Sequence, residues 1–207
     1  MEGYKMTLGG RLISLFPMFY LFSVLSCIGK MLYAFQPLDL IIFPSIIYLM
    51  PLGLHRVHFL FFPFSDGYWV LSEKKYNPWW ASHMFQFPFI ACPWIESLLH
   101  FVPGLFSLWL RCWGSKIGKG IFWTPRVEVL DRGLIEVGNY AIIGHLTAMS
   151  SHMVAEMEGK PSLVIKTIKI GEKAFIGVDT QIGPGAVIKP REKVKPKTRI
   201  YWRGEWP

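Results

Sequence analysis

Residues 170–200 read IGEKAFIGVDTQIGPGAVIKPREKVKPKTRI. In this stretch an aliphatic residue recurs at every sixth position without a miss: Ile170, Ile176, Ile182, Ile188, Val194 and Ile200. Six is neither the 3.6-residue period of a helix nor the two-residue alternation of a single strand. The period predicts a chain wound as a triangular solenoid, in which each short strand turns one aliphatic side chain inward.

Glycines mark the same repeat. Gly171, Gly177 and Gly183 directly follow the first three of these aliphatic residues. Glycine adopts backbone angles that are closed to residues with a side chain. We therefore expect these glycines to form the tight corners between successive strands, and not a phosphate-binding loop.

The repeat begins further upstream. It opens at Ile117, is irregular for about twenty residues, and becomes regular again at Val137, Ile143 and Met149, which are six positions apart. The next phased residue, Ile170, follows Met149 by 21 positions, so the phase slips.

The interruption predicts an extruded segment. We expect a solenoid domain over residues 116–207 with an extruded loop at about 153–167. A loop that leaves a repeat structure is a common place for function.

Composition divides the chain into two halves. The 207 residues are 52% hydrophobic and 16% aromatic but 17% charged, against about a quarter charged in typical soluble domains. The mean hydropathy is +0.32. Of the 22 Lys and Arg residues, 7 lie before position 116 and 15 lie at position 116 or after it. An apolar half joined to a charged, repetitive half predicts a membrane module and a cytoplasmic module.

Residues 1–65 are expected to form transmembrane or re-entrant helices. The run Leu12–Gly29 has no charge and is long enough to span, or nearly span, a hydrocarbon core. Its apolar character continues to Phe35 without a small-residue cleavage site, which favours a retained anchor over a signal peptide. A second run, Leu40–Leu54, contains two prolines and is short for a full span. The sequence is compatible with two arrangements: a hairpin that enters the bilayer and returns to the same side, and two tilted transmembrane spans.

Residues 66–115 start with a polar connector, 66–76, and become aromatic from 77 to 113. Four prolines cut the aromatic part into short pieces and exclude one continuous spanning helix. We expect short helices in the lipid headgroup layer, with an ordinary buried core as the alternative. The tryptophans expected at the interface are Trp79, Trp80, Trp94, Trp109 and Trp113.

The formal net charge of +8 has three competing explanations. No basic helix or aromatic-basic motif accompanies it, which argues against nucleic acid as a partner. Anionic lipid headgroups and a polyanionic cofactor remain. Cys27, Cys92 and Cys112 show neither disulfide-framework nor metal-site spacing, so we expect reduced thiols and a cytoplasmic catalytic half.

The segments Ile170–Gly177 and Ile182–Ile188 resemble the hexapeptide-repeat acyltransferases, over about residues 116 to 207. The resemblance implies a left-handed parallel β-helix, transfer of an acyl group (most often acetyl) from coenzyme A, and a homotrimer with active sites between adjacent solenoids. The run Leu110–Gly118 is similar to the entrance of membrane-associated variants. The tail Gly204–Pro207 stops where many members continue into a helix.

The resemblance also implies a catalytic histidine directly before the extruded loop. His152 occupies that place, and His145, one coil step earlier, is the rival. A neutral imidazole near physiological pH is suited to remove the proton of an attacking hydroxyl or amine. Glu156 and Glu158 are candidates to orient that imidazole.

Coenzyme A carries phosphates, and basic residues alternate through the last hexads. They are Lys189, Arg191, Lys193, Lys195, Lys197 and Arg199. Of these we expect Lys189, Lys193 and Lys195, together with Gly177, to bind acyl-CoA. A solvated, lipid-facing strip is the alternative for these lysines. No metal is expected.

The sequence thus predicts an α+β membrane protein, with N-terminal transmembrane or interfacial helices followed by a C-terminal left-handed parallel β-helix. We expect it at the cytoplasmic (inner) membrane of a bacterium. The expected acceptor is a hydroxyl or amine at the membrane surface, on a lipid-linked sugar, a glycolipid or an exported polymer. One alternative is a zinc carbonic anhydrase, for which the second half offers only His145 and His152. Another is a non-catalytic, membrane-tethered scaffold or a subunit of a polymer-export assembly.

Overall fold

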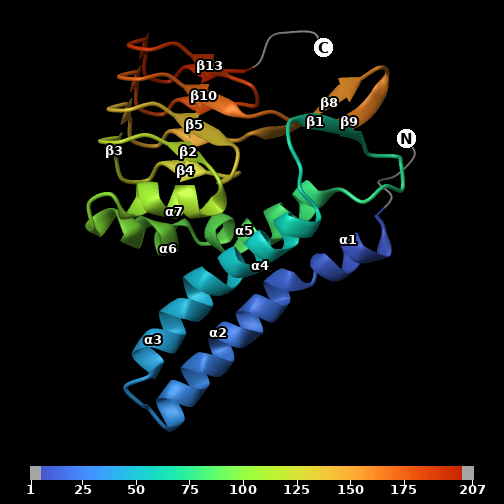
Figure 1. The fold of residues 1–207 in the computed structure, drawn as a ribbon, viewed down its shortest axis with the longest axis vertical. Helices are drawn as coiled ribbons and strands as arrows, with labels where there is room; N and C mark the ends of the chain where they lie inside the picture. Colours follow the sequence, from blue (N-terminus) through green and yellow to red (C-terminus); the bar gives the residue numbers. More distant parts are fainter. Residues whose placement is uncertain (1–5, 202–207) are drawn as a thin grey trace. The chain divides into compact units, whose positions relative to one another are not determined.

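The computed structural model describes residues 6–201, so the tail Gly204–Pro207 lies outside the described residues (Figure 1). The chain forms two compact units. Among the described residues, the helical unit contains 6–64 together with 74–91, and the solenoid unit contains 65–73 and 92–201. Residues 66–115, which we expected to form one interfacial segment, are therefore divided between the two units.

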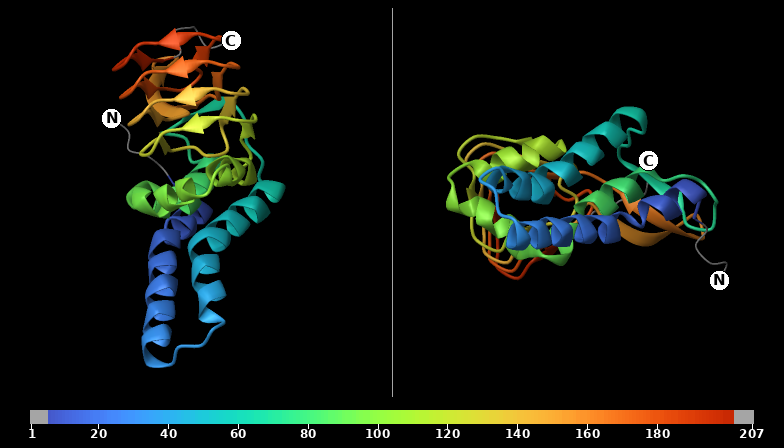
Figure 2. Two further views of the ribbon diagram at one scale, coloured as in Figure 1. Left: turned by 90° about the vertical axis from the view of Figure 1, so that its left-hand side faces the viewer. Right: turned by 90° about the horizontal axis from the view of Figure 1, so that it is seen from below.

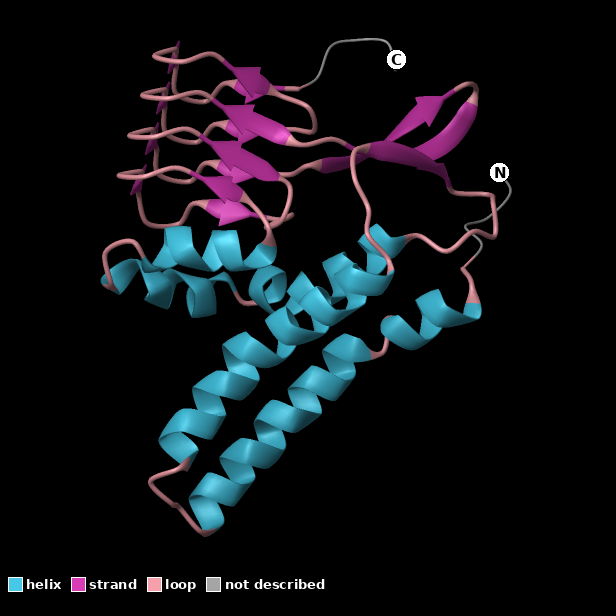
Figure 3. Cartoon of the chain, in the orientation of Figure 1, coloured by secondary structure: helices cyan, strands magenta, loops and turns pink. Residues whose placement is uncertain are grey.

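The solenoid unit is built on three parallel sheets, which we number as faces (Figures 2 and 3). Face 1 contains β2 (Lys116–Ile117), β5 (Ile135–Val137), β10 (Ile168–Ile170) and β13 (Val187–Ile188). Face 2 contains β3 (Phe122–Trp123), β6 (Ile142–Ile143), β11 (Phe175–Ile176) and β14 (Lys193–Val194). Face 3 contains β4 (Glu128–Val129), β7 (Ala148–Met149), β12 (Gln181–Ile182) and β15 (Arg199–Ile200).

The chain visits face 1, face 2 and face 3 in turn, so the described residues make four stacked coils with three corners. The last residue of most strands points into the core; Ile143, Met149 and Ile176 are completely buried. Stacked aliphatic residues pair across coils, as Ile170 does with Ile188. The six-residue period therefore predicted these strands and their inward side chains correctly.

The corner glycines have a different role from the one expected. The left-handed backbone lies three positions after each inward aliphatic residue, for example at Lys173 (φ 57°) and Asp179 (φ 56°), and not at Gly171 or Gly177. A Cβ added to Gly144 would lie 2.6 Å from the Ile176 carbonyl oxygen of the next coil. These glycines are needed because the backbone of the neighbouring coil approaches too closely for a side chain.

The expected extruded loop is an antiparallel hairpin, β8 (His152–Met157) and β9 (Lys160–Ile165). It leaves the stack of coils between β7 and β10 (Figure 3). A third strand, β1 (Gly67–Val70), pairs antiparallel with β9, although we expected only a polar connector there. Nearby, Asp66 Oδ1 accepts hydrogen bonds from the Thr167 backbone N–H and hydroxyl at 2.9 and 2.6 Å.

Short helices lead into the first coil. They are α6 (Pro93–Ser97), a 3₁₀ turn (Leu98–Phe101) and α7 (Leu105–Trp113), and α7 packs against β2. Trp109 and Trp113 are buried, 6% and 1% exposed, with their rings edge to face at 5.5 Å. These two tryptophans lie in a protein core, the alternative that we weighed against the headgroup layer.

The helical unit comprises α1 (Leu8–Ile13), α2 (Phe16–Tyr33), α3 (Asp39–Pro44), a π-helical turn (Ser45–Leu49), α4 (Met50–Phe61) and α5 (Pro78–Ala91). The two prolines at positions 44 and 51 do not break the second helix, because the π-helical turn accommodates them. Leu8–Tyr33 and Asp39–Phe61, of 26 and 23 residues, are long and apolar enough to cross a membrane. A signal sequence or the core helix of a soluble protein meets the same criterion.

Candidate active site

Both departures from the six-residue repeat occur at one corner, where face 3 leads back to face 1. In the first coil, the segment 130–134 connects β4 to β5 and is longer than the regular corners. In the second coil, residues 150–167 connect β7 to β10 and contain the hairpin. The two insertions therefore lie one above the other on neighbouring coils, and we call this place the insertion corner.

The insertion corner brings a histidine and a carboxylate together. His152 Nδ1 lies 2.7 Å from Asp131 Oδ2, with side-chain exposures of 20% and 2%. The Ser151 backbone N–H donates a hydrogen bond to the same carboxylate oxygen at 2.8 Å. Asp131 is thus fixed from the coil above it, and His152 is partly open to solvent.

This contact selects the chemistry of the imidazole ring. When Nδ1–H donates to the Asp131 carboxylate, the lone pair of the neutral ring is on Nε2, which is then the atom that can take a proton. A carboxylate at Nδ1 also stabilises the imidazolium that forms after that proton is taken. The pair therefore has the geometry that a general base oriented by a carboxylate requires.

Ser150 does not complete a nucleophilic triad. Its hydroxyl donates to the His152 carbonyl oxygen at 2.9 Å and lies 3.3 Å from Nδ1, on the same nitrogen as Asp131. In a Ser-His-Asp triad the serine hydroxyl contacts the other ring nitrogen, Nε2. The geometry therefore does not support Ser150 as a nucleophile activated by His152.

A buried ion pair holds the segment that carries Asp131. Arg132 Nε and Nη2 lie 2.6 and 2.7 Å from the two carboxylate oxygens of Glu96, and both residues are buried. Trp109 Nε1 donates to Glu96 at 2.7 Å, and the Ser115 hydroxyl donates to the Arg132 carbonyl oxygen at 2.6 Å. A two-pronged arginine–carboxylate pair of this kind is geometrically specific, so it fixes the position of the neighbouring Asp131.

The rival histidine lies elsewhere. His145 is at the corner between faces 2 and 3, with Nδ1 2.6 Å from the Pro125 carbonyl oxygen. Its own carbonyl oxygen accepts from the Asp179 backbone N–H of the next coil at 2.8 Å. His145 and His152 thus belong to the same coil but to two different corners.

Neither glutamate that we expected to orient His152 is the residue in contact with it; Asp131 has that position. Glu156 is exposed on β8, and Glu158 accepts a hydrogen bond from the Tyr68 hydroxyl at 3.3 Å. The negative charge of Glu158, followed by burial, raises the pKa of Tyr68 above its usual value of 10.0.

The expected cofactor-binding lysines gather around face 2 of the last coil. Lys193 points outward from β14, and Lys189 and Lys195 are exposed at the corners on either side of it. Gly177 lies below the Lys195 corner, where an added Cβ would meet the Pro196 backbone. Because face 2 is opposite the insertion corner, one chain does not bring these lysines together with His152.

Face 2 also carries apolar side chains on its outer surface. Large hydrophobic residues are exposed along its strands and at its two corners: Phe122, Tyr140, Ile142, Leu146, Phe175 and Val178. Their exposed fractions run from 40% at Ile142 to 61% at Phe122. An apolar patch of this extent on a folded surface marks an interaction site.

Sequence reasoning missed Asp131, although a signal for it exists. Val129 and Val137 are inward residues of consecutive strands, and they are eight positions apart where the repeat requires six. The two additional residues fall at the same corner as the later insertion, and the segment they enlarge contains Asp131 and Arg132. Both interruptions of the six-residue repeat, after Val129 and after Met149, fall at the same corner of neighbouring coils. Noting this in the sequence would have placed Asp131 beneath His152.

Comparisons with known proteins give distant similarity to solved structures only. No protein-family model matches the chain, and no curated protein matches it. The crystal structure of a hexapeptide-repeat containing acetyltransferase from Vibrio cholerae is similar at 12% sequence identity and a TM-score of 0.33. The match covers 55% of this chain and 88% of that protein. A similarity at that TM-score assigns no function to this chain.

Proposed function

We propose that this protein is a membrane-associated acyltransferase that moves an acyl group, acetyl in the simplest case, from acyl-CoA to a hydroxyl or amine. His152 is the general base. The observation that carries the proposal is the 2.7 Å contact between its Nδ1 and the buried Asp131 carboxylate. The resemblance of the repeat to hexapeptide acyltransferases supports this proposed activity. The same resemblance is the reason that we propose a left-handed winding for the solenoid.

The reaction requires one proton to be moved twice. His152 Nε2 takes the proton of the acceptor while its oxygen or nitrogen attacks the thioester carbonyl carbon. The tetrahedral intermediate then collapses, the carbon–sulfur bond breaks, and the imidazolium returns the proton to the departing thiolate. Asp131 stabilises the imidazolium between these two transfers, and a base so placed gives about 10²–10⁴-fold acceleration.

The donor is proposed to bind through its phosphates to the basic residues around face 2 of the last coil. Lys189, Lys193 and Lys195 are the principal contacts, and Gly177 lies in the corner column below them. Since this face is opposite the insertion corner, the lysines of one chain serve the His152 of another. This requirement supports a homotrimer, and the exposed apolar patch on face 2 supplies a surface for it.

The acceptor is proposed to lie at the membrane surface. Two long apolar helices support attachment to the cytoplasmic membrane, with the solenoid on the cytoplasmic side. A lipid-linked sugar, a glycolipid or a polymer under export would present a hydroxyl or amine at that surface.

The test is acceptor-dependent release of thiol from acetyl-CoA by the full-length protein in detergent, followed with a thiol reagent. A panel containing a lipid-linked sugar, a glycolipid and an amine-bearing polysaccharide supplies the acceptor. His152→Ala should lower the rate by about 10²–10⁴-fold, and His145→Ala is the matched control that should not. The reverse pattern would move the base to His145.

A specific observation also favours the scaffold alternative, since the apolar patch on face 2 fits a binding surface without catalysis. The two functions differ in one measurement. Binding of acetyl-CoA by calorimetry, together with thiol release, supports the transferase, whereas the absence of both with every acceptor supports the scaffold.

A further inference from the structure

The helical unit contains a hairpin whose tip has no net charge. Between Arg11 and Arg56 the only Asp, Glu, Lys or Arg residues are Lys30 and Asp39. Lys30 Nζ lies 2.5 and 2.6 Å from the two Asp39 carboxylate oxygens, and Asp39 is 1% exposed. The two charges at the far end of the hairpin therefore neutralise each other.

Two backbone N–H groups of the connector between the two helices, residues 34–38, find partners within the hairpin. The Ala34 N–H donates to the Lys30 carbonyl oxygen at 2.8 Å, and the Gln36 N–H donates to Asp39 Oδ2 at 2.8 Å. The Asp39 N–H donates to the Gln36 carbonyl oxygen at 2.9 Å, and Pro37 has no N–H to satisfy. Hydrocarbon offers no hydrogen bonds, so a turn placed inside a bilayer needs this kind of self-sufficiency.

Polar side chains in the two helices of the hairpin also form their hydrogen bonds within the hairpin. The hydroxyls of Ser23 and Ser45 donate to the carbonyl oxygens four positions earlier, at 2.9 and 2.7 Å. Large apolar side chains are exposed at Phe22 (70%) along the helix and at Leu32 (85%), Tyr33 (94%) and Leu40 (65%) around the tip. Apolar surface on all sides of a helix pair fits a lipid environment.

The length of the hairpin limits how far it reaches. Arg56 lies 17 positions after Asp39, which is about 26 Å of helix, against about 30 Å for a hydrocarbon core. Near the base, α5 packs on the hairpin, with Phe89 stacked on Tyr48 at 6.2 Å. From Tyr48 to Asp39 the helix extends about 14 Å, close to the depth of a single leaflet.

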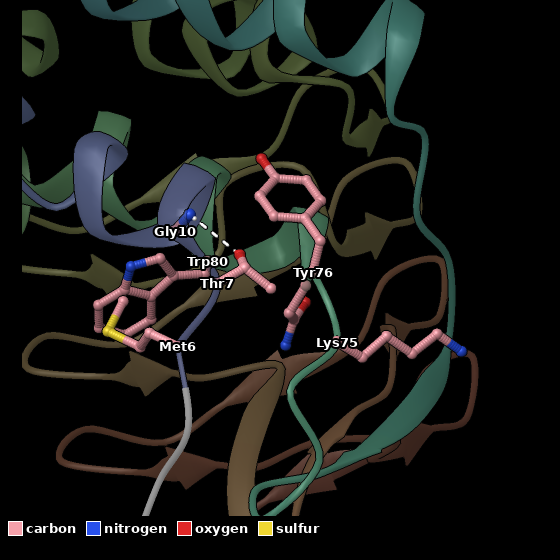
Figure 4. Close-up of a pocket in the computed structure, with 7 residues that line it drawn as sticks. Met6, Thr7, Gly10, Lys75, Tyr76 and Trp80 are labelled. Atoms are coloured by element: carbon pink, nitrogen blue, oxygen red, sulfur yellow. Dashed lines mark hydrogen bonds between the residues drawn. The ribbon is translucent and has the colours of Figure 1, made fainter.

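The base of the hairpin carries the residue types of a headgroup layer. A small cleft there is lined by Thr7, Lys75, Tyr76 and Trp80 among others, and Figure 4 shows Lys75 extending away from Trp80. Trp80 Nε1 donates to the Ser14 hydroxyl at 2.9 Å. Aromatic rings with polar edges beside a lysine are typical of a membrane–water interface.

We infer that residues 16–61 form a re-entrant hairpin that inserts into a lipid bilayer without crossing it and returns to the same side. The connector 34–38 stays within the hydrocarbon, and Arg11 and Arg56 lie in one headgroup layer. The inference rests on the membrane attachment proposed above and specifies how that attachment is made. It predicts that the tip never meets water on the opposite side.

The test uses the full-length chain with its three cysteines replaced by alanine, reconstituted in sealed vesicles. Gln36→Cys reports on the tip, and Lys75→Cys is the matched control at the exposed base. A membrane-impermeant maleimide is applied from outside, from inside, and after detergent. We expect Lys75→Cys to react from one side, and Gln36→Cys to react only after detergent.

Reaction of Gln36→Cys from the side opposite to Lys75→Cys would overturn the inference in favour of two spans, while leaving membrane attachment intact. Reaction of both from the same side would show that the tip lies outside the bilayer and would also overturn it. Flotation with the vesicles tests attachment separately, because a protein that stays at the bottom of the gradient contradicts the proposed attachment itself.

Discussion

Asp131 lies beneath His152, and its Oδ2 is 2.7 Å from the imidazole Nδ1 although the two residues belong to neighbouring coils. They meet because both insertions in the solenoid occur at the same corner. The regular coils therefore provide a rigid frame, and the His152–Asp131 pair lies where the six-residue repeat is interrupted.

Asp131→Asn should reduce kcat by about 10²–10⁴-fold with little change in stability. The amide keeps the size of the side chain but cannot stabilise the imidazolium. Because Asp131 and His152 act as one unit, the double variant Asp131→Asn/His152→Ala should be no slower than His152→Ala alone. Initial rates of thiol release measure all three. Glu158→Gln is the control, and an Asp131→Asn protein with the wild-type rate would remove Asp131 from the mechanism.

Arg132→Met should lower the free energy of unfolding by about 3–5 kcal/mol, because it leaves Glu96 buried without its ion-pair partner. The double variant Glu96→Gln/Arg132→Met removes both charges and should recover part of this loss. Chemical denaturation in detergent measures each value. Equal destabilisation in the single and double variants would contradict a role for the ion pair as such.

His100 should make the protein sensitive to acid. Its ring stacks on Phe106 at 4.3 Å, and burial lowers its pKa below the usual 6.5, although Glu96 acts in the opposite direction. Below that pH the unfolded chain binds more protons at this residue than the folded chain. Its stabilising contribution is therefore present above pH about 6.5 and is lost as the pH falls toward the lowered pKa.

The measurement for His100 is the midpoint of thermal unfolding at about pH 7.5 and about pH 5.5. We expect a larger drop for the wild type than for His100→Gln, which cannot titrate. The same drop in both proteins would assign the acid sensitivity to other groups.

Phe175→Glu should break the proposed homo-oligomer, because it places a charge in the middle of the apolar patch on face 2. The mass of the protein in detergent, from light scattering on a sizing column, should fall to that of one chain. Lys169→Glu on face 1 is the matched control and should leave the mass unchanged. A wild-type protein that is already a single chain would remove this support for an active site shared between copies.

Much of the solenoid could be predicted from the sequence because its interactions are periodic. Ile176 is buried and pairs with Val194 one coil later, and the same geometry recurs at each hexad. The site of the hairpin could be predicted for the same reason, since a break in a strict period is visible. The resemblance to hexapeptide acyltransferases suggested His152 as the base through its place next to that break, and this role stays a prediction.

The rest depends on contacts that no local pattern encodes. The Asp131 contact arises from the phase of two separate insertions, and the role of Gly144 arises from the distance between coils. Pro44 and Pro51 lie within the second apolar run, yet a π-helical turn keeps the helix continuous there. In each case a contact with a neighbouring element determines the structure, and the preference of the local sequence does not.

The short strand β1 ties the end of the chain's apolar region to the inserted hairpin, pairing Gly67 with Ile165 across almost a hundred positions. Each coil otherwise pairs with the coil next to it, so most of this unit can assemble progressively along the chain. Removing residues 1–115 would remove β1 and leave one edge of β9 unpaired. An unpaired strand edge can pair with strands of other molecules. The solenoid, in this architecture, is not a module that can be separated from what precedes it.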